Sequence, residues 1–177
     1  MVQIGDTAPA FDLPATDGSR HSLEDGAQAT VVYWTCNHCP YALAWHDRMI
    51  DLARDYADRG VRVLAINSNN AESHPADSFE AMRERVESEG DWAHPYLHDE
   101  SQAVARAYGA ICTPDFFGYD AAHKLQYRGR LDDGRTSPPP AGARRELVEA
   151  MRAIAATGAA PAEQNASVGC SIKWKAA

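Results

Sequence analysis

The segment Val31-Val32-Tyr33-Trp34-Thr35-Cys36-Asn37-His38-Cys39-Pro40 joins a strand pattern to a helix pattern through two cysteines. Its first residues are β-branched or aromatic, which is typical of a buried strand. Pro40 suits the first turn of a helix, and the Ala, Leu and Trp residues that follow it favour a helix. The segment therefore predicts that a strand delivers Cys36 and Cys39 to the start of a helix.

Two thiols at the start of a helix have a specific chemistry. The first N–H groups of a helix lack partners within it, and the helix dipole makes this end positive, so an anion is stabilised there. The pKa of a thiol, ordinarily about 8.5, falls to roughly 3.5–7.5 in favourable motifs of this kind. The thiolate is the reactive species, and the second thiol can close a disulfide with it. We therefore interpret Cys36 and Cys39 as a redox centre.

The composition is that of an ordinary globular protein, with 45% hydrophobic and 24% charged residues. The length of 177 residues suits one domain with a sizeable core. A net charge of −8 disfavours nucleic acid and anionic membranes as partners. No apolar run is close in length to the about 20 residues that a membrane-spanning helix needs. Residues 1–6 lack the basic and apolar segments of a secretory signal, so we expect a cytoplasmic protein.

Hydrophobic periodicity predicts the elements that surround the two cysteines. Apolar residues recur at intervals of three and four after Pro40, which indicates an amphipathic helix that ends at Gly60. The largely apolar residues 61–66 predict a central strand, and Asp77 with Glu80 resembles the capping box of a second helix. The remaining patterns predict a hairpin-like turn at Asp17-Gly18, a short strand from Tyr96, a brief helix within residues 99–108, an antiparallel hairpin of strands over residues 113–119 and 125–128, and a last helix over residues 147–155.

This order of elements indicates an α/β sandwich with a mixed sheet. The first crossover predicts a parallel pair of strands, and the late hairpin adds antiparallel ones. We expect one domain over residues 1–157, followed by a tail over residues 158–177 that contains Cys170. The tail is rich in polar and turn-forming residues, so it is ordered only if Cys170, Ile172 and Trp174 anchor it.

Three pieces of sequence resemble the thioredoxin superfamily, specifically the peroxiredoxin-like (AhpC/TSA-like) redoxin subgroup that carries Cys-x-x-Cys. They are Gly5-x-x-Ala8-Pro9-x-Phe11-x-Leu13 with Asp17-Gly18, then Trp34-Thr35-Cys36-Asn37-His38-Cys39-Pro40, and Thr113-Pro114, at the position of the family's cis-proline. The tail over residues 169–175 is similar to the ending of a subgroup of these proteins. The resemblance implies a thioredoxin-like three-layer sandwich, with a mixed central sheet and helices on both faces.

The resemblance also implies the roles of the site residues. Cys36 would be the attacking thiol and Cys39 the resolving thiol of a thiol–disulfide oxidoreductase. A cis peptide before Pro114 would present backbone for substrate pairing and keep metal away from the thiols. The expected partners are protein or small-molecule thiols and disulfides, and peroxides in the case of a peroxidase, with no cofactor, in a monomer or homodimer. The shell of the site would comprise Trp34, Thr35, Asn37, His38, Pro40, Thr113 and Pro114.

Two alternatives to this function stay open. A thiol peroxidase would oxidise Cys36 to a sulfenic acid that Cys39 resolves. However, peroxiredoxins place a proline before the reactive cysteine, and here none lies between Pro14 and the dithiol. The second alternative is a metal-binding or metallochaperone site, although zinc usually requires four ligands and the remaining cysteines are distant in sequence. Thioredoxins carry a buried acid where this chain has Thr30, so the proton acceptor for Cys39 is unassigned.

Two further hypotheses concern His38 and the remaining cysteines. A partly positive imidazole at His38 would stabilise a thiolate and so make the disulfide more oxidising than that of a thioredoxin with Gly-Pro between its cysteines. Cys112 lies two residues before Pro114, and the tail could bring Cys170 to it as a second thiol pair. The alternative is that Cys112 and Cys170 are small buried hydrophobic residues.

Overall fold

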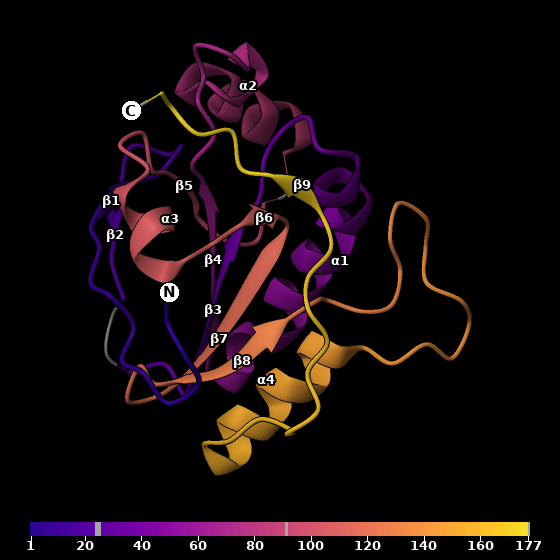
Figure 1. The fold of residues 1–177 in the computed structure, drawn as a ribbon. Coiled ribbons are helices and arrows are strands. Elements are labelled where there is room, and N and C mark those ends of the chain that lie inside the picture. The colour runs from indigo at the N-terminus through magenta and orange to yellow at the C-terminus, as the bar shows by residue number, and fades with distance from the viewer. Residues whose placement is uncertain (24–25, 91, 177) are drawn as a thin grey trace.

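The computed structural model describes residues 1–23, 26–90 and 92–176. Its elements follow one another along the chain as shown in Figure 1. They are β1 (Leu13–Pro14), β2 (Arg20–His21), β3 (Ala29–Trp34), α1 (Pro40–Tyr56), η1 (Ala57–Arg59), β4 (Val61–Asn67), η2 (Pro75–Asp77), α2 (Phe79–Glu89), β5 (Tyr96–His98), α3 (Ala103–Tyr108), β6 (Cys112–Thr113), β7 (Asp115–Asp120), β8 (Leu125–Gly129), α4 (Glu146–Thr157) and β9 (Cys170–Ser171).

The central sheet has five strands in the order β5-β4-β3-β7-β8. β3 pairs in parallel with β4, and β4 pairs in parallel with β5. β7 is antiparallel to β3 and forms a hairpin with β8. The mixed sheet and its late antiparallel hairpin are therefore confirmed. β1 and β2 form the expected small hairpin around Asp17-Gly18.

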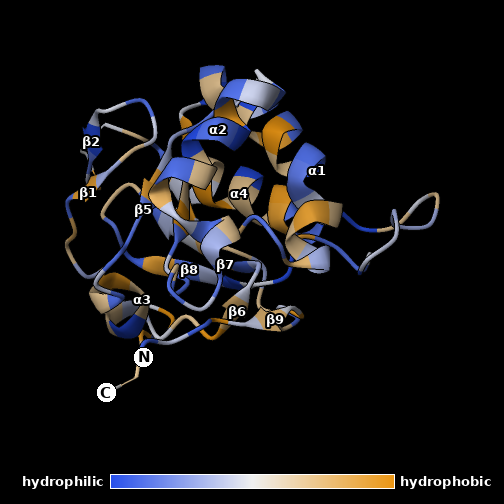
Figure 2. Ribbon diagram, turned by 90° about the horizontal axis from the view of Figure 1, so that it is seen from above, coloured by the Kyte–Doolittle hydropathy of each residue, from blue (hydrophilic) through white to orange (hydrophobic). Residues whose placement is uncertain are grey.

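Helices and loops cover both faces of this sheet, which gives a three-layer sandwich (Figures 1 and 2). Alternate residues of β3 point to opposite faces, as the pleat of a strand requires. Val31 and Tyr33 belong to the core that α1 and α4 cover. Val32 and Trp34 belong to a second core, which α3 and the N-terminal segment cover. Every residue of β3 is buried, so the strand that leads to the dithiol lies at the centre of the molecule.

The boundaries of α1 follow from its terminal residues. Pro40 occupies the first turn, where its missing N–H costs no hydrogen bond. The helix continues through η1 to Gly60, whose φ of 72° is left-handed backbone that favours glycine. The predicted helix and its end are confirmed. The apolar stripe, including Trp45 and Met49, is buried against the sheet.

The predicted capping box of α2 is wrong by one residue. Ser78, not Asp77, is the residue before the helix, and its hydroxyl accepts a hydrogen bond from the N–H of Ala81 at 3.1 Å. Asp77 instead ends the preceding turn η2 and is fully buried. A serine satisfies the free N–H groups of a helix as well as an aspartate does. The aspartate is therefore available for contacts elsewhere.

The tail returns across the molecule after α4. Beyond Gly158 the chain, yellow in Figure 1, passes β8 and reaches β6, where it adds the short strand β9. Hydrogen bonds from the N–H of Arg128 to Gln164 Oε1 (2.8 Å) and from the N–H of Arg130 to the carbonyl of Asn165 (2.9 Å) hold it against β8. Ile172 is 3% exposed and belongs to the second core. The tail is thus anchored on both sides of Cys170.

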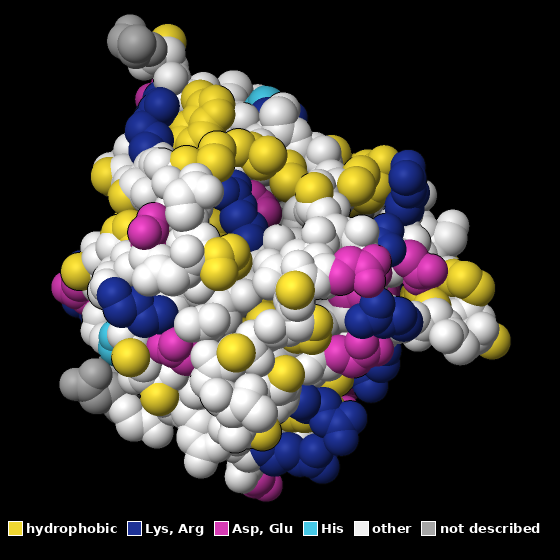
Figure 3. Space-filling view, turned by 60° about the horizontal axis from the view of Figure 1, so that its bottom comes forward, with side chains coloured by type: hydrophobic (Ala, Val, Ile, Leu, Met, Phe, Trp, Pro, Cys, Tyr) yellow, Lys and Arg dark blue, Asp and Glu magenta, His cyan; other side chains and the backbone are white. Residues whose placement is uncertain are grey.

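The surface carries charges of both signs. On the face shown in Figure 3, basic and acidic side chains lie among one another, with hydrophobic side chains scattered between them. Such a mixed surface is typical of globular domains. Within the described ranges, no helix combines the length and the apolar character that crossing a bilayer requires.

Candidate active site at the dithiol

The two cysteines lie at the junction between the central strand and α1. β3 ends at Trp34, and Cys39 is the residue immediately before the first helical residue, Pro40. Both Cys36 and Cys39 have an exposed fraction of 0%, and both are free thiols. Burial excludes solvent from both sulfurs, and the N–H of Ala42 in the first turn of α1 stabilises a negative charge on the sulfur of Cys39.

Thr113 contacts both sulfurs from the opposite side. The Thr113–Pro114 peptide bond is cis, as the resemblance implied. Oγ1 of Thr113 lies 3.3 Å from Sγ of Cys36, and the carbonyl oxygen of Thr113 accepts a hydrogen bond from Sγ of Cys39 at 3.1 Å. The hydroxyl can donate to an ionised Cys36, whereas the carbonyl can accept only from a protonated Cys39. The contacts of Thr113 therefore favour the state in which Cys36 is a thiolate and Cys39 is protonated.

The pKa values of the two thiols shift in opposite directions, because each thiol hydrogen-bonds the other. The pKa of Cys39 is lowered, chiefly by a hydrogen bond from the Cys36 thiol. The Cys170 thiol and the N–H groups of Ala42 and Cys170 lower it further. The pKa of Cys36 is raised by the same hydrogen bond to Cys39, by burial, and by the nearby charge of Asp77. A proton that moves between the two sulfurs changes which of them is the thiolate.

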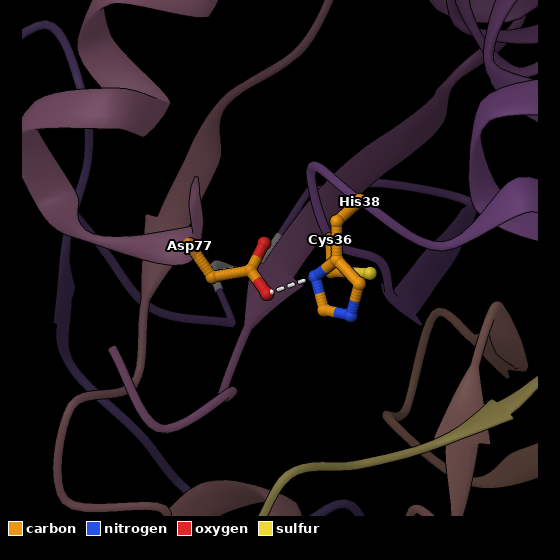
Figure 4. A group of neighbouring side chains, drawn as sticks. All are labelled: Cys36, His38 and Asp77. Atoms are coloured by element: carbon orange, nitrogen blue, oxygen red, sulfur yellow. Dashed lines mark hydrogen bonds and ion pairs between the residues drawn. The ribbon is translucent and has the colours of Figure 1, made fainter. Parts of the chain in front are cut away.

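His38 and Asp77 lie beside Cys36. Figure 4 shows the carboxylate of Asp77 directed at the imidazole of His38, with the sulfur of Cys36 close to the same ring. Nδ1 of His38 and Oδ2 of Asp77 are 2.6 Å apart. The carboxylate also accepts a hydrogen bond from the N–H of Asn37 at 2.7 Å. Asp77 therefore holds two consecutive residues of the turn that separates the cysteines.

Asp77 is the site residue that the sequence interpretation missed. Its Oδ1 also accepts from the amide of Asn67 (3.3 Å), and its Oδ2 from the amide of Asn69 (2.8 Å). Both oxygens thus have two partners, which satisfies a fully buried carboxylate. The available signal in the sequence was the polar run Asn67-Ser68-Asn69-Asn70 at the end of β4, which the structure shows to be buried and therefore in need of partners.

One cluster has the composition of a metal site. Cys36, His38 and Asp77 bring a sulfur, a ring nitrogen and a carboxylate oxygen within 4.8 Å of one another. Both oxygens of Asp77 already accept hydrogen bonds from protein groups, so the carboxylate is positioned to hold the Asn37–His38 turn. A bound cation would have to displace at least one of these hydrogen bonds.

The other predicted shell residues have mainly structural contacts. The indole N–H of Trp34 donates to Ser68 Oγ at 3.0 Å, and its ring packs in the second core. Thr35 is buried and donates its backbone N–H to the carbonyl of Ile66. Asn37 has a larger role, since its Oδ1 accepts hydrogen bonds from Tyr96 (3.0 Å) and Arg85 (3.2 Å). Arg85 also donates to the carbonyl of Cys36 at 3.3 Å.

Cys170 lies with the dithiol. It is the partner of Thr113 across the antiparallel β6–β9 pair, and it packs against the group formed by Cys36, Cys39 and Ala42. Cys112 is the partner of Ser171, so its side chain lies on the opposite face of this pair. Burial raises the pKa of the Cys112 thiol to about 12. The pairing of Cys112 with Cys170 stays a prediction, and the structure groups Cys170 with Cys39 instead.

The fold and the arrangement of β3, α1 and the cis-proline define a redoxin of the thioredoxin superfamily. The chain belongs to the AhpC/TSA family, whose family model matches residues 4–128.

Individual proteins resemble this chain to different degrees. It is 27% identical over 129 residues to the thiol-disulfide oxidoreductase ResA of Geobacillus thermodenitrificans, covering 71% of this chain and 68% of that protein. An uncharacterized conserved protein from Geobacillus kaustophilus has a crystal structure with a TM-score of 0.90 and 42% identity, covering 100% of this chain and 95% of that one. The thioredoxin domain of a thiol-disulfide oxidoreductase from Bacteroides vulgatus shares the fold, with a TM-score of 0.60, 16% identity, and coverage of 76% and 91%.

Proposed function

We propose that this protein is a thiol–disulfide oxidoreductase whose redox couple is the Cys36–Cys39 dithiol. The observation that carries the proposal is the position of Thr113, which offers a hydroxyl to the sulfur of Cys36 and a carbonyl to that of Cys39. Together with the start of α1, it supplies separate partners for a thiolate and for a thiol. The name of the relative ResA supports the same class of reaction.

The reaction begins with a proton transfer within the pair. The Cys36 proton passes along its hydrogen bond to Cys39, and the resulting Cys39 thiol donates to the carbonyl of Thr113. Cys36 is then the thiolate, and the hydroxyl of Thr113 and the N–H of His38 stabilise it. This order agrees with the attacking role that the resemblance assigns to Cys36.

The two chemical steps are thiol–disulfide exchanges. The Cys36 thiolate attacks a substrate disulfide, a mixed disulfide forms, and the first substrate sulfur leaves as a thiolate. Cys39 then loses its proton and attacks Cys36, which releases the second substrate sulfur. In sum, two electrons and two protons pass from the dithiol to the substrate, and a Cys36–Cys39 disulfide remains. The reverse sequence would oxidise a dithiol.

The proposal is tested by trapping the covalent intermediate. In a Cys39→Ser variant the mixed disulfide on Cys36 cannot be resolved, so partners with an accessible disulfide should accumulate as complexes that dithiothreitol releases. A Cys36→Ser/Cys39→Ser variant is the matched control and should trap nothing. Wild-type protein should also accelerate the reduction of insulin by dithiothreitol. Absence of both trapping and insulin reduction would overturn the proposal, and consumption of hydrogen peroxide by the dithiol without either would indicate a peroxidase instead.

A further inference from the structure

Backbone pairing between the tail and β6 brings a third sulfur, that of Cys170, to the dithiol. β9 pairs with β6 so that Cys170 faces Thr113, the residue that contacts both sulfurs of the dithiol. On the C-terminal side, the N–H of Lys173 donates to Asn69 Oδ1 at 2.8 Å, and the carbonyl of Lys173 accepts from the N–H of Asn70 at 2.8 Å. These bonds fix the position of Cys170 along the strand.

The tail lies so close to the cis-proline turn that only glycine fits there. A Cβ added at Gly169 would overlap the carbonyl oxygen of Thr113 and come within 3.0 Å of the nitrogen of Pro114. The residue immediately before Cys170 therefore has its backbone against the backbone that faces the dithiol. This close approach is what allows the sulfur of Cys170 to reach Cys39.

Cys170 packs against the group formed by Cys36, Cys39 and Ala42. Its thiol and its backbone N–H both lower the pKa of the Cys39 thiol. Cys36 and Cys39 have an exposed fraction of 0%, whereas Cys170 is half-buried. Of the three sulfurs at this site, Cys170 is therefore the one that solvent reaches while the tail is docked.

We propose that Cys170 is a third redox-active cysteine, which exchanges a disulfide with Cys39 and so connects the buried pair to thiols and disulfides in solvent. This inference rests on the proposed oxidoreductase function and extends it. It also gives the tail a role in the reaction as the segment that carries the sulfur exposed to small-molecule partners such as glutathione.

The internal exchange needs no electron donor, and the reduction that follows it takes two electrons from external thiols. Starting from the Cys36–Cys39 disulfide, the Cys170 thiolate attacks Sγ of Cys39. The Cys36–Cys39 bond breaks, a Cys39–Cys170 bond forms, and Cys36 leaves as a thiolate next to the hydroxyl of Thr113. An external thiolate that then attacks Cys170 regenerates the Cys39 thiolate, and a second external thiol resolves the mixed disulfide on Cys170. The external thiols are oxidised to a disulfide, and the protein is reduced by two electrons.

The test uses full-length variants that retain only two of the relevant sulfurs. A Cys36→Ser/Cys112→Ser variant keeps Cys39 and Cys170. After oxidation with oxidised glutathione, peptide mapping without reductant should find the Cys39–Cys170 disulfide in most molecules. The matched control, Cys36→Ser/Cys170→Ser, keeps Cys39 and Cys112 and should carry glutathione or free thiols but no internal disulfide. A Cys36→Ala/Cys112→Ala version guards against misfolding caused by buried serine hydroxyls.

The outcomes separate this inference from the proposed function. If wild-type protein forms the Cys36–Cys39 disulfide while the Cys39–Cys170 disulfide is absent from both Cys36→Ser/Cys112→Ser and Cys36→Ala/Cys112→Ala, the inference is overturned and the proposed function stands. A variant with glutathione on Cys39 and on Cys170 separately would overturn it in the same way. If wild-type protein forms no Cys36–Cys39 disulfide, the proposed function itself fails.

Discussion

Oδ2 of Asp77 lies 2.6 Å from Nδ1 of His38, and this contact joins the end of η2 to the turn between the two cysteines. The carboxylate belongs to a segment about forty residues further along the chain. Its charge faces the imidazole and also raises the pKa of Cys36. From the sequence alone we expected His38 to stabilise a Cys36 thiolate. The charge of Asp77 acts in the opposite direction, because it raises the pKa of Cys36.

Replacing Asp77 should make Cys36 more acidic. In a Cys39→Ser background, Asp77→Asn removes a like charge near the Cys36 sulfur, so the pKa of Cys36 should fall by about one unit, the order expected for a neighbouring charge. Rates of alkylation by iodoacetamide, measured against pH, give this pKa directly. Asp132→Asn is the matched control, because Asp132 is also buried but pairs with Arg48. An unchanged pKa in the Asp77 variant would contradict the assigned role.

The dithiol should be a weaker reductant than thioredoxin. A lowered pKa of Cys39 stabilises the reduced form, and a more stable reduced form raises the reduction potential. We therefore expect the reduction potential of the Cys36–Cys39 pair to lie above that of thioredoxin, which is about −270 mV. Equilibration with glutathione buffers, followed by alkylation and mass spectrometry of the Cys36–Cys39 peptide, measures it. A potential as low as that of a thioredoxin treated in parallel would refute this expectation.

The stability of the reduced protein should depend on pH through Cys39. The pKa of Cys39 in the folded protein lies below its unfolded value of about 8.5. The contribution of the Cys39 thiolate to the free energy of unfolding is therefore fully present above about pH 8.5 and is lost as the pH falls through the folded pKa. Within this window the loss is at most roughly 1.4 kcal/mol per pH unit. The raised pKa of Cys36 acts only above about pH 8.5, so it does not cancel this trend.

Urea unfolding of the reduced protein at pH 8 and pH 5.5 measures this effect. The difference in free energy of unfolding between wild type and a Cys39→Ser variant should be smaller at the lower pH. The oxidised protein has no titrating thiol in the pair, so it serves as the second control. A difference between wild type and variant that does not change with pH would rule out an ionised Cys39.

Gly169→Ala should displace the tail from the dithiol. The added methyl group would overlap the carbonyl of Thr113, and such overpacking typically costs about 1–3 kcal/mol. Docking of the tail should weaken by roughly 10- to 100-fold, since about 1.4 kcal/mol corresponds to a factor of ten. Alkylation of Cys39 should become faster by a similar factor. Ser171→Ala, at an exposed neighbouring position, should leave that rate unchanged.

The measurement for the Gly169 variant is time-resolved alkylation with peptide mapping. Hydrogen exchange of the Ile172 and Lys173 amides should also increase, because both donate to groups outside the tail in the docked arrangement. If Cys39 remains as protected in Gly169→Ala as in Ser171→Ala, the tail does not control access to the dithiol.

The sequence by itself determined the elements around the dithiol. Hydrophobic periodicity reports which residues of a segment share a buried face, so β3, α1, β4 and the β7–β8 hairpin follow from local patterns. The position of two thiols at the start of a helix is likewise local, since it depends on adjacent residues. The cis bond before Pro114 came only from the resemblance, because a cis X-Pro bond occurs in about 5–6% of cases in folded proteins and has no local signature here.

Only the tertiary structure decided which distant residues complete the site. Asp77 matched a helix-capping pattern in the sequence, yet Ser78 caps the helix, and the buried Asp77 binds the Asn37–His38 turn. The sequence left open whether Cys170 pairs with Cys112, and only the register of β9 on β6 shows that Cys170 lies opposite Thr113 and against Cys39. Each outcome depends on the path by which a segment returns to the dithiol, and a shift of one residue in strand pairing reverses the face on which a side chain lies.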